Sequence, residues 1–392
     1  MLNLHDKFYP MDTPFVYDRY VTGKCFVGRK KECDILSNLL DAGEHVVMYE
    51  PPKTGKMSLV QQTLMNMRSA GKQFVTTHVD LFNVRTLESF LVRFGTAVLR
   101  ACMTTPEQFK DAVERHLAGT HFVFDISGFY REGTIVSMNW NPDLEDVKCM
   151  MRLPSLLAEE RGVPFYVVIK EFQMLTWNEE CEDALPAIEQ VLQEKRQGPS
   201  ASFILTGSQV NAMKYIFEEK KYFYRQVVYL PLRPLDDREI IDHIVRGFLY
   251  GPGKSFDRNL AMGACNLFKC HIWYLNHLAA ICDSMSKGFI NEGIMVEALN
   301  SMISLNEPRF MNVVNDLTDH QMSLLKAVLD GVVRLSASEV IEKYRLNSSA
   351  NVRRVKDALR KKEVITFNEK DEPVIMDPLF EYWLSKYYFE RQ

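Results

Sequence analysis

A glycine–lysine pair, Gly55-Lys56, carries the strongest chemical signal in the sequence. It follows an apolar run at 46–49 and a short turn, and an amphipathic stretch begins at the lysine. This order matches the phosphate-binding loop G-x-x-x-x-G-K-[ST], in which backbone N–H groups cradle phosphates and the lysine contacts the outer ones. The match is partial, because Glu50 stands at the first glycine position and Met57 at the hydroxyl position.

Five short apolar runs, each followed or preceded by an amphipathic stretch, are expected to position this loop. They lie at 46–49, 74–81, 164–169, 203–206 and 226–230. Continuous apolar runs are typical of strands that are buried on both faces. Their alternation with helices predicts an α/β fold, with a mostly parallel sheet and helices on both faces.

Two helix starts and one insertion stand out between these runs. Thr86 precedes an apolar helical stripe, and Thr105-Pro106 with Gln108 has the composition of a capping box with proline at the first helical position. Residues 121–140 contain two β-rich runs around a turn-rich centre, which predicts an inserted β-hairpin.

The C-terminal part has a different pattern. From Pro231 to about residue 305 only helices are expected, and no strand. Three further helices and a hairpin then follow, at 319–329, 336–344, 348–361 and 364–376. Three helices and a terminal hairpin predict a winged helix-turn-helix.

Length and composition limit the class of protein. The 392 residues exceed one compact core and suggest two or three domains. No apolar run approaches the length of a membrane span, and the first residues do not resemble a signal peptide. The eight cysteines form no C-x-x-C pair, so we expect reduced thiols in a cytoplasmic protein rather than zinc sites or disulfides.

Several motifs together resemble the prokaryotic AAA+/STAND ATPase group that is found mainly in archaea and Bacteroidetes. An F-x-G-R box precedes the loop, a charged pair ends the 164–169 run, and T-G-S ends the 203–206 run. A lid segment is similar to the sensor-2 region, although it lacks that region's glycine and proline, and the chain closes on D-P-x-F-x-x-W. These motifs stand at 26–29, 170–173, 206–208, 270–275 and 377–383.

The resemblance implies a P-loop NTPase fold with a parallel sheet, an all-α lid and a winged helix-turn-helix. The expected order is an irregular leader at 1–25, an ATPase-like core at 26–230, a helical lid at 231–312 and a winged-helix domain at 313–392. The hairpin at 121–140 is an insertion in the core.

The same resemblance assigns roles to the site residues. Lys170 stands where a metal-holding aspartate belongs, and Glu171 stands at the water-activating position. Met57 has no hydroxyl for the metal, and Ser58 comes one residue late, about 100° round the helix. Glu50 would repel phosphate oxygens. We therefore expect no Mg²⁺ and no turnover, with ATP or ADP still possible. The other residues of this degenerate nucleotide site would be Lys53, Thr54, Gly55, Lys56, Ser208 and Arg225.

Two of the replacements, Glu50 and Lys170, carry opposite charges. In this fold the 203–206 strand lies between the strands that end at Glu50 and Lys170, so the two backbones would be about 10 Å apart. We hypothesise that an ion pair between them fills the space of the metal and phosphate. The alternative is that both side chains are solvated and unrelated.

The basic third helix of the winged-helix domain is the other functional candidate. Arg353, Arg354 and Lys356 lie near its start, where a recognition helix contacts DNA. The same module also docks proteins. His116 and His121 are interpreted as structural, and no metal site is expected.

Three functions follow from these residues. They are a non-hydrolysing binding or scaffold module with a protein partner or self-association, an ATP-binding switch of weak activity, and a DNA-binding regulator.

Overall fold

The computed structural model describes residues 14–131, 133–194, 198–251 and 253–390. They divide into two compact units. Residues 31–52 and 63–232 are termed the α/β unit, and the remaining described residues are termed the helical unit.

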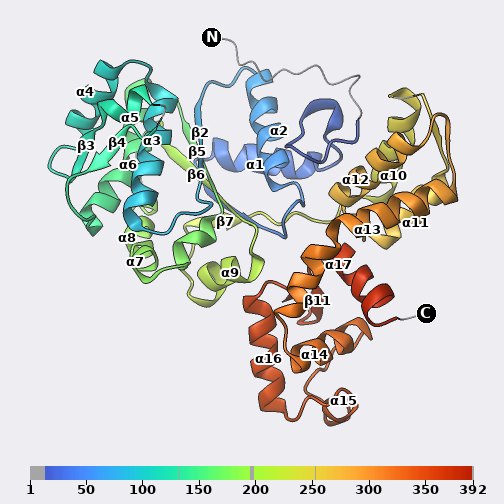
Figure 1. Ribbon diagram of the computed structural model, residues 1–392. Helices are drawn as coiled ribbons and strands as arrows, with labels where there is room; N and C mark the ends of the chain where they lie inside the picture. Colours follow the sequence, from blue (N-terminus) through green and yellow to red (C-terminus); the bar gives the residue numbers. More distant parts are fainter. Residues whose placement is uncertain (1–13, 132, 195–197, 252, 391–392) are drawn as a thin grey trace. The chain divides into compact units, whose positions relative to one another are not determined.

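A five-stranded parallel sheet is the centre of the α/β unit (Figure 1). Its order is β2-β5-β6-β1-β7, and these strands span Val75–Asp80, Phe165–Lys170, Ala201–Gly207, His45–Tyr49 and Val227–Tyr229. Every residue of β6 is buried, as expected for a central strand with both faces covered. The predicted α/β fold is confirmed, and so is the position of β6 between β5 and β1.

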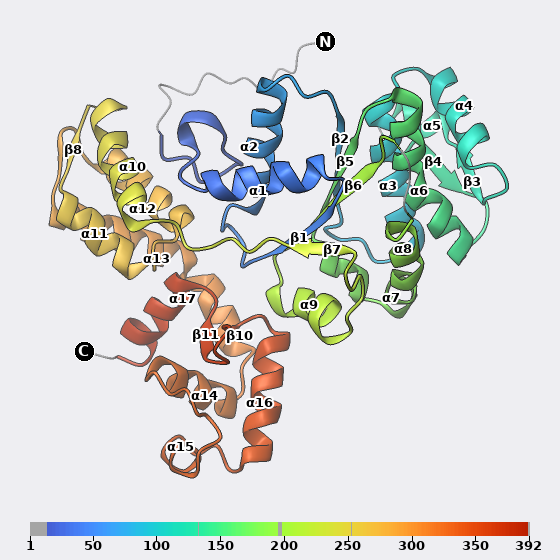
Figure 2. The same cartoon turned by 180° about the vertical axis from the view of Figure 1, so that it is seen from behind.

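Helices cover both faces of this sheet (Figures 1 and 2). On one face, α3 (Leu87–Cys102) packs on β2 and α6 (Leu144–Arg161) packs on β5 and β6, while α1 (Lys30–Asp41) lies on the other. The remaining helices that lie wholly in this unit are α4 (Pro106–His116), α5 (Ile126–Tyr130), η2 (Phe172–Thr176), α7 (Glu179–Asp183), α8 (Leu185–Leu192), α9 (Val210–Lys214) and η3 (Tyr215–Glu219).

The predicted caps and the predicted hairpin are present. Thr86 caps α3, and Thr105 caps α4 in a capping box with Gln108. In the insertion, β3 (Phe122–Phe124) pairs antiparallel with β4 (Val136–Met138). The stretch between these two strands is not a simple turn but contains α5, because the Asp125 carboxylate accepts from an N–H of its first turn.

The helical unit contains the predicted lid. Its helices are α10 (Asp237–Tyr250), α11 (Arg258–Leu267), α12 (Ile272–Met285) and α13 (Glu292–Asn315). The expectation of no strand between Pro231 and about residue 305 is wrong in one place, where β8 (Ser255–Phe256) pairs in parallel with β9 (Phe289–Ile290). Helix α13 passes without a break through residue 312, where the sequence suggested the end of the lid.

The predicted winged helix follows α13 in the same unit. It contains α14 (Asp319–Leu329), α15 (Ser338–Lys343), α16 (Ser349–Lys361), the antiparallel strands β10 (Ile365–Phe367) and β11 (Pro373–Ile375), and then α17 (Pro378–Trp383) and η4 (Leu384–Tyr388). All expected helices and the hairpin are present, within two residues of the expected bounds.

One hydrophobic cluster runs through the helical unit, from Phe15 through the lid helices to Trp383. Phe15 belongs to the expected irregular leader, yet it is 1% exposed and its ring lies 4.5 Å from that of Phe248. Gly247 permits this contact, because a Cβ there would lie 2.7 Å from the Phe15 ring. The described end of the leader is therefore part of the lid core.

The expectation that all eight cysteines stay reduced is wrong for one pair. Cys265 and Cys270 are joined by a disulfide, and the other six cysteines form no disulfide. The two sulfurs meet because the chain turns back at the end of α11, which a spacing of five residues does not reveal.

Candidate functional site

The phosphate-binding loop of the sequence is a turn that leads into α2 (Lys56–Ser69). Lys53 and Gly55 both have positive φ angles, of 68° and 94°. The Gly55 carbonyl accepts from the Leu59 N–H, so the loop closes onto the first turn of α2. Met57 is buried in this turn and offers a thioether instead of a hydroxyl. The strand–turn–helix path persists although the first glycine is replaced.

Lys53 makes a contact that the sequence did not indicate. Its Nζ lies 3.4 Å from the ring centroid of Trp273 in α12, a cation–π contact. Burial lowers the pKa of Lys53, and the nearby Arg309 guanidinium lowers it further. The loop lysine therefore faces the lid within the helical unit.

The N-terminal segment, residues 14–29, lies against the same loop. The Val21 N–H donates to Ser58 Oγ at 3.1 Å, and the Gly23 N–H donates to Gln62 Oε1 at 2.6 Å. The Arg29 guanidinium donates to the Thr54 carbonyl at 3.3 Å. Ser58, which follows Met57 in the sequence, thus accepts a hydrogen bond from the protein's own backbone.

The lid holds this segment from its other side. Trp273 Nε1 donates to the Tyr17 carbonyl, and Asn276 Nδ2 donates to the Val16 carbonyl at 3.0 Å. Tyr17 also stacks on His277, with ring centroids 4.3 Å apart. Between segment, loop and lid there remains a cavity of about 70 Å³. Pockets for drug-sized ligands are about 300–1,000 Å³, so this cavity is too small for a nucleotide.

The α/β unit carries the other candidate residues, and Lys170 at the end of β5 is paired there. Its Nζ lies 2.5 Å from Asp80 Oδ2 at the end of the adjacent strand β2. Partial burial alone would raise the pKa of Asp80, but hydrogen bonds from Lys170 and the Phe82 N–H hold that pKa below its usual value. Sequence reasoning missed Asp80. The hypothesised ion pair between Glu50 and Lys170 stays a prediction.

Glu171 is held by two side chains of the same unit. Its Oε2 accepts from Ser208 Oγ at 2.5 Å and from Gln173 Nε2 at 2.7 Å. Its backbone has a positive φ of 56°, which is strained for a residue with a Cβ. Gly207 is required beside this group, because a Cβ there would lie 2.7 Å from Gln173 Oε1 and closer still to Met213. The structure thus brings the two site candidates Glu171 and Ser208 into contact.

Arg225 is not brought together with these residues. It precedes β7, whose first residue Val227 pairs with His45 at the start of β1. Arg225 therefore lies at the amino-terminal edge of the parallel sheet. At the carboxyl edge, Lys170 is the last residue of β5, and Glu50 and Ser208 directly follow β1 and β6.

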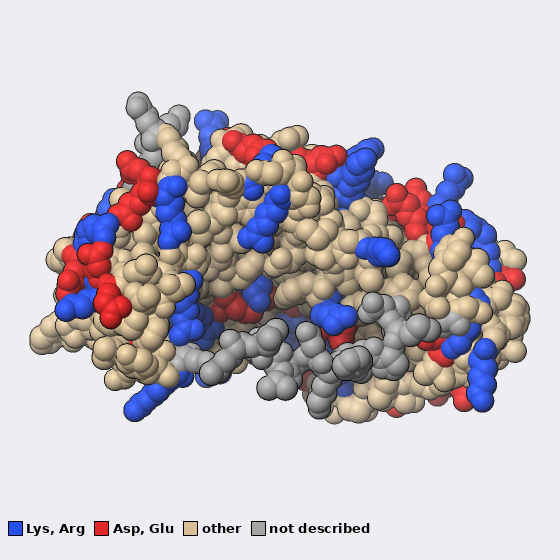
Figure 3. Space-filling model, turned by 90° about the horizontal axis from the view of Figure 1, so that it is seen from above, with Lys and Arg blue, Asp and Glu red and all other residues tan. Residues whose placement is uncertain are grey.

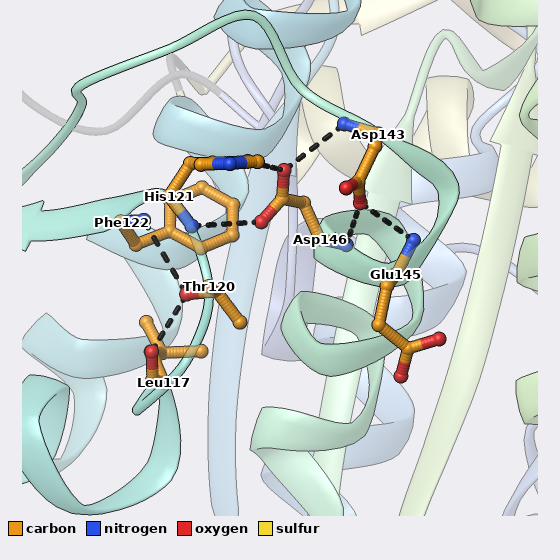
Figure 4. Close-up of polar contacts among 7 residues, drawn as sticks. All are labelled: Leu117, Thr120, His121, Phe122, Asp143, Glu145 and Asp146. Carbon is orange, nitrogen blue, oxygen red and sulfur yellow. Dashed lines mark hydrogen bonds and ion pairs between the residues drawn. The ribbon is translucent and has the colours of Figure 1, made fainter.

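The two histidines singled out in the sequence pair with different carboxylates. His116 lies 3.0 Å from Glu160, and His121 Nδ1 donates to Asp146 Oδ2 at 2.8 Å. Figure 4 shows the His121 imidazole and the Asp143 N–H converging on the carboxylate of Asp146. Ligand atoms of His121, Asp143 and Asp146 are close enough to share a metal ion, but protein donors already engage both carboxylates. We interpret this group as a cap that ties the insertion to α6.

This cap is expected to make stability depend on pH. The hydrogen bond to Asp146 raises the pKa of His121, so its contribution is full below the usual histidine pKa, about 6.5, and fades as pH rises through the raised value. Burial would raise the pKa of Asp146, but donors from His121 and Asp143 lower it, so its contribution is lost only as pH falls below about 4. The melting temperature of His121→Gln should therefore lie furthest below that of the wild type near pH 5.5. A difference that stays constant to pH 8 would contradict this assignment.

The winged helix presents its basic residues on α16. Arg353 and Arg354 are exposed, and the Arg354 guanidinium donates to Asn351 in the preceding turn. Lys356 is half-buried, with its Nζ 4.4 Å from the ring centroid of Phe367 in β10. Two of the three DNA-binding candidates thus reach solvent, and the third also supports the wing.

A polar network joins the winged helix to the lid. Asp377 Oδ1 accepts from the Tyr274 hydroxyl at 2.7 Å, and its Oδ2 accepts from Arg309 at 2.8 Å. The same carboxylate caps α17 through the N–H groups of Leu379 and Phe380. The D-P-x-F-x-x-W ending thus forms the joint between α12, α13 and α17. Local periodicity gave no sign of these contacts.

Charge on the visible surface is mixed. On the face drawn in Figure 3, lysine and arginine side chains are interspersed with aspartate and glutamate. Among the described residues, we find no helix with the length and hydropathy of a membrane span.

Comparisons with known proteins bear on the fold. Residues 308–386 match the family model described as "Probable winged helix domain". The chain is similar to the Walker-type ATPase of Pyrococcus abyssi, with a TM-score of 0.66, 16% identity, and coverage of 95% of this chain and 99% of that one. The chain has the fold of a Walker-type ATPase that ends in a winged helix.

A second solved structure has a similar fold. The ORC2 protein of Aeropyrum pernix, solved as ADPNP–ADP complexes, gives a TM-score of 0.57 at 14% identity, with 93% of each chain covered. No curated protein matches the sequence. The predicted resemblance is thus confirmed for the fold, and identities this low say nothing about activity.

Proposed function

We propose that this chain is a non-hydrolysing binding or scaffold module built on the fold of a Walker-type ATPase. The observation that carries the proposal is the ion pair of Lys170 with Asp80. By the resemblance, the Lys170 ammonium group would stand at the position of the metal-holding carboxylate, and Asp80 of the neighbouring strand compensates its charge. Mg²⁺ prefers oxygen ligands in an octahedral arrangement, and a lysine both removes one ligand and repels the ion.

The P-loop supports the same proposal from the helical unit. Met57 cannot supply the hydroxyl ligand, and Ser58 accepts a hydrogen bond from the N-terminal segment. The cavity beside Lys53 and Gly55, at about 70 Å³, does not hold a nucleotide unless the segment moves. Without a metal, Glu171 would have no bound water to activate. Binding of ATP or ADP would therefore be weak and independent of Mg²⁺.

The test is thermal unfolding with ATP or ADP, each with and without Mg²⁺. A nucleotide present at 100 times its Kd would stabilise the folded protein by about 2.7 kcal/mol, which gives a readily measured shift in melting temperature. We expect no shift that requires Mg²⁺, and phosphate release no faster than that of Lys56→Ala. A shift that needs Mg²⁺, or hydrolysis that Lys56→Ala abolishes, would favour an ATP-binding switch of weak activity instead.

As a scaffold, the chain would act through a protein partner or self-association, and DNA is a second candidate partner. The specific observation in its favour is the exposure of Arg353 and Arg354 on the third helix of a winged helix. Protein–DNA contacts to phosphates weaken steeply with salt.

DNA binding is tested by measuring affinity for duplex DNA at low and at moderate salt. A DNA-binding regulator should bind with a strong salt dependence, and Arg353→Ala/Arg354→Ala should reduce the affinity at least tenfold. Lys370→Ala, at an exposed position of the wing turn, is the matched control for removing a surface cation. If Lys370→Ala reduced the affinity for DNA as much as Arg353→Ala/Arg354→Ala, the attraction would be nonspecific. The scaffold function would then be favoured over a DNA-binding regulator.

A further inference from the structure

The disulfide of Cys265 and Cys270 closes a very short ring in the lid. The two Cα atoms are 4.4 Å apart, and the Cys270 N–H donates to the Cys265 carbonyl at 2.7 Å. Lys269 and Cys270 both adopt positive φ angles, which turn the chain back after α11. The backbone turn, with its own hydrogen bond, therefore holds the two side chains together whether or not the sulfurs are bonded.

A disulfide that closes so short a ring stabilises the fold less than one that closes a long loop. A disulfide stabilises mainly by restricting the unfolded chain, and this effect grows with the length of the closed loop. Only four residues separate Cys265 from Cys270, so the bond removes less freedom from the unfolded state than a bond across a long loop would. Its formation and loss are therefore compatible with one fold.

The two sulfurs differ in access. Cys265 is 1% exposed and lies in the lid core, whereas Cys270 is half-buried and precedes α12. A carboxylate oxygen of Asp237 and both sulfur atoms lie within 4.8 Å of one another. A negative charge at this distance disfavours a thiolate, and the thiolate is the form that attacks a disulfide.

We propose that Cys265 and Cys270 form a reversible thiol–disulfide site whose reaction partners are low-molecular-weight thiols and disulfides. In oxidation, the Cys270 thiolate attacks an external disulfide R–S–S–R and expels one R–S⁻. The Cys265 thiolate then attacks Sγ of Cys270, breaks the mixed disulfide and expels the second R–S⁻. The pair loses two protons and two electrons, and the external disulfide becomes two thiols. Reduction is the reverse, with entry again at Cys270.

The position of the pair suggests what the reaction changes. Helix α12 begins two residues after Cys270, and its first turn carries Trp273, which faces Lys53 of the loop. Reduction of the disulfide removes the side-chain cross-link between the end of α11 and the residues just before α12. Exchange of backbone amides at the start of α12 should accelerate in the reduced protein, while exchange in α13 stays unchanged.

A thiol count in graded mixtures of reduced and oxidised glutathione tests the proposal on the native 392-residue chain. After quenching and denaturation, the oxidised form should show six thiols and the reduced form eight. The conversion should follow a single two-electron transition, with mass spectrometry placing the change on Cys265 and Cys270. A bond that survives strong reductant in the folded protein, or that never forms, would overturn the proposal.

Single substitutions test the entry point and the role of the carboxylate. Cys265→Ser should leave Cys270 to form a stable mixed disulfide with glutathione, and Cys270→Ser should leave Cys265 unmodified. Asp237→Asn should speed oxidation severalfold at neutral pH, and Asp236→Asn is the control for a change of charge at the neighbouring residue. A faster reaction at Cys265, or no effect of Asp237→Asn beyond its control, would overturn the assigned chemistry.

Discussion

Trp383→Ala should lower the free energy of unfolding of the winged helix by about 3–5 kcal/mol, the usual cost of truncating a fully buried aromatic side chain. The indole is 2% exposed, and its ring lies 5.6 Å from that of Phe310 in α13. Its Nε1 also donates to Glu307 at 3.3 Å. Chemical unfolding measures the loss of stability, and hydrogen exchange of the backbone amides in β10 and β11 locates it in the winged helix.

Trp140→Ala is the matched control, because that tryptophan is 75% exposed. Its expected change is within about 0.5 kcal/mol. Similar losses for the two substitutions would mean that Trp383 does not anchor the winged helix to α13. A loss confined to the helical unit, with exchange in the α/β unit unchanged, would confirm that the two units unfold separately.

Asp377→Ala should cost about 2–4 kcal/mol, as the sum of a lost helix cap and a stranded tyrosine hydroxyl. The carboxylate caps α17 and accepts from Tyr274, whose pKa is raised by burial and by this neighbouring charge. The contact with Arg309 adds less, because that arginine side chain is 51% exposed. Thermal unfolding of the variant measures the change.

Asp377→Asn separates the two contributions. Its amide oxygen still accepts from the cap N–H groups or from Tyr274, so it should lose about 1 kcal/mol. Asp316→Ala, which removes an exposed carboxylate paired with Lys362, is expected to be nearly neutral. If Asp377→Ala lowered the free energy of unfolding no more than Asp316→Ala, the polar contacts between lid and winged helix would not stabilise the protein.

These two positions give the proposed scaffold a physical basis. Asp377 and Trp383 attach the winged helix to α12 and α13, and α12 also holds Lys53 and the N-terminal segment. A partner that bound the winged helix would therefore act on a lid that already contacts the loop, without need for nucleotide hydrolysis.

The sequence by itself determined the architecture. Apolar runs such as 164–169 predicted buried parallel strands, Thr86 and Thr105 marked helix starts, and the pattern after residue 317 predicted the winged helix. These features depend on neighbours within a few residues, where side-chain chemistry and helix or strand period decide the outcome. The departures at Met57 and Lys170 could likewise be read from position alone.

Only the tertiary structure decided what those residues touch. Lys170 pairs with Asp80, which is 90 residues away in sequence, because β2 and β5 are adjacent and in register. Ser58 is engaged by Val21, and Cys270 meets Cys265 through a left-handed turn. Such contacts depend on strand order, register and backbone path across distant segments, which the local pattern of one sequence does not specify. The motif at Gly55-Lys56 predicted a phosphate loop, and the fold decided that the protein's own N-terminal segment lies against it.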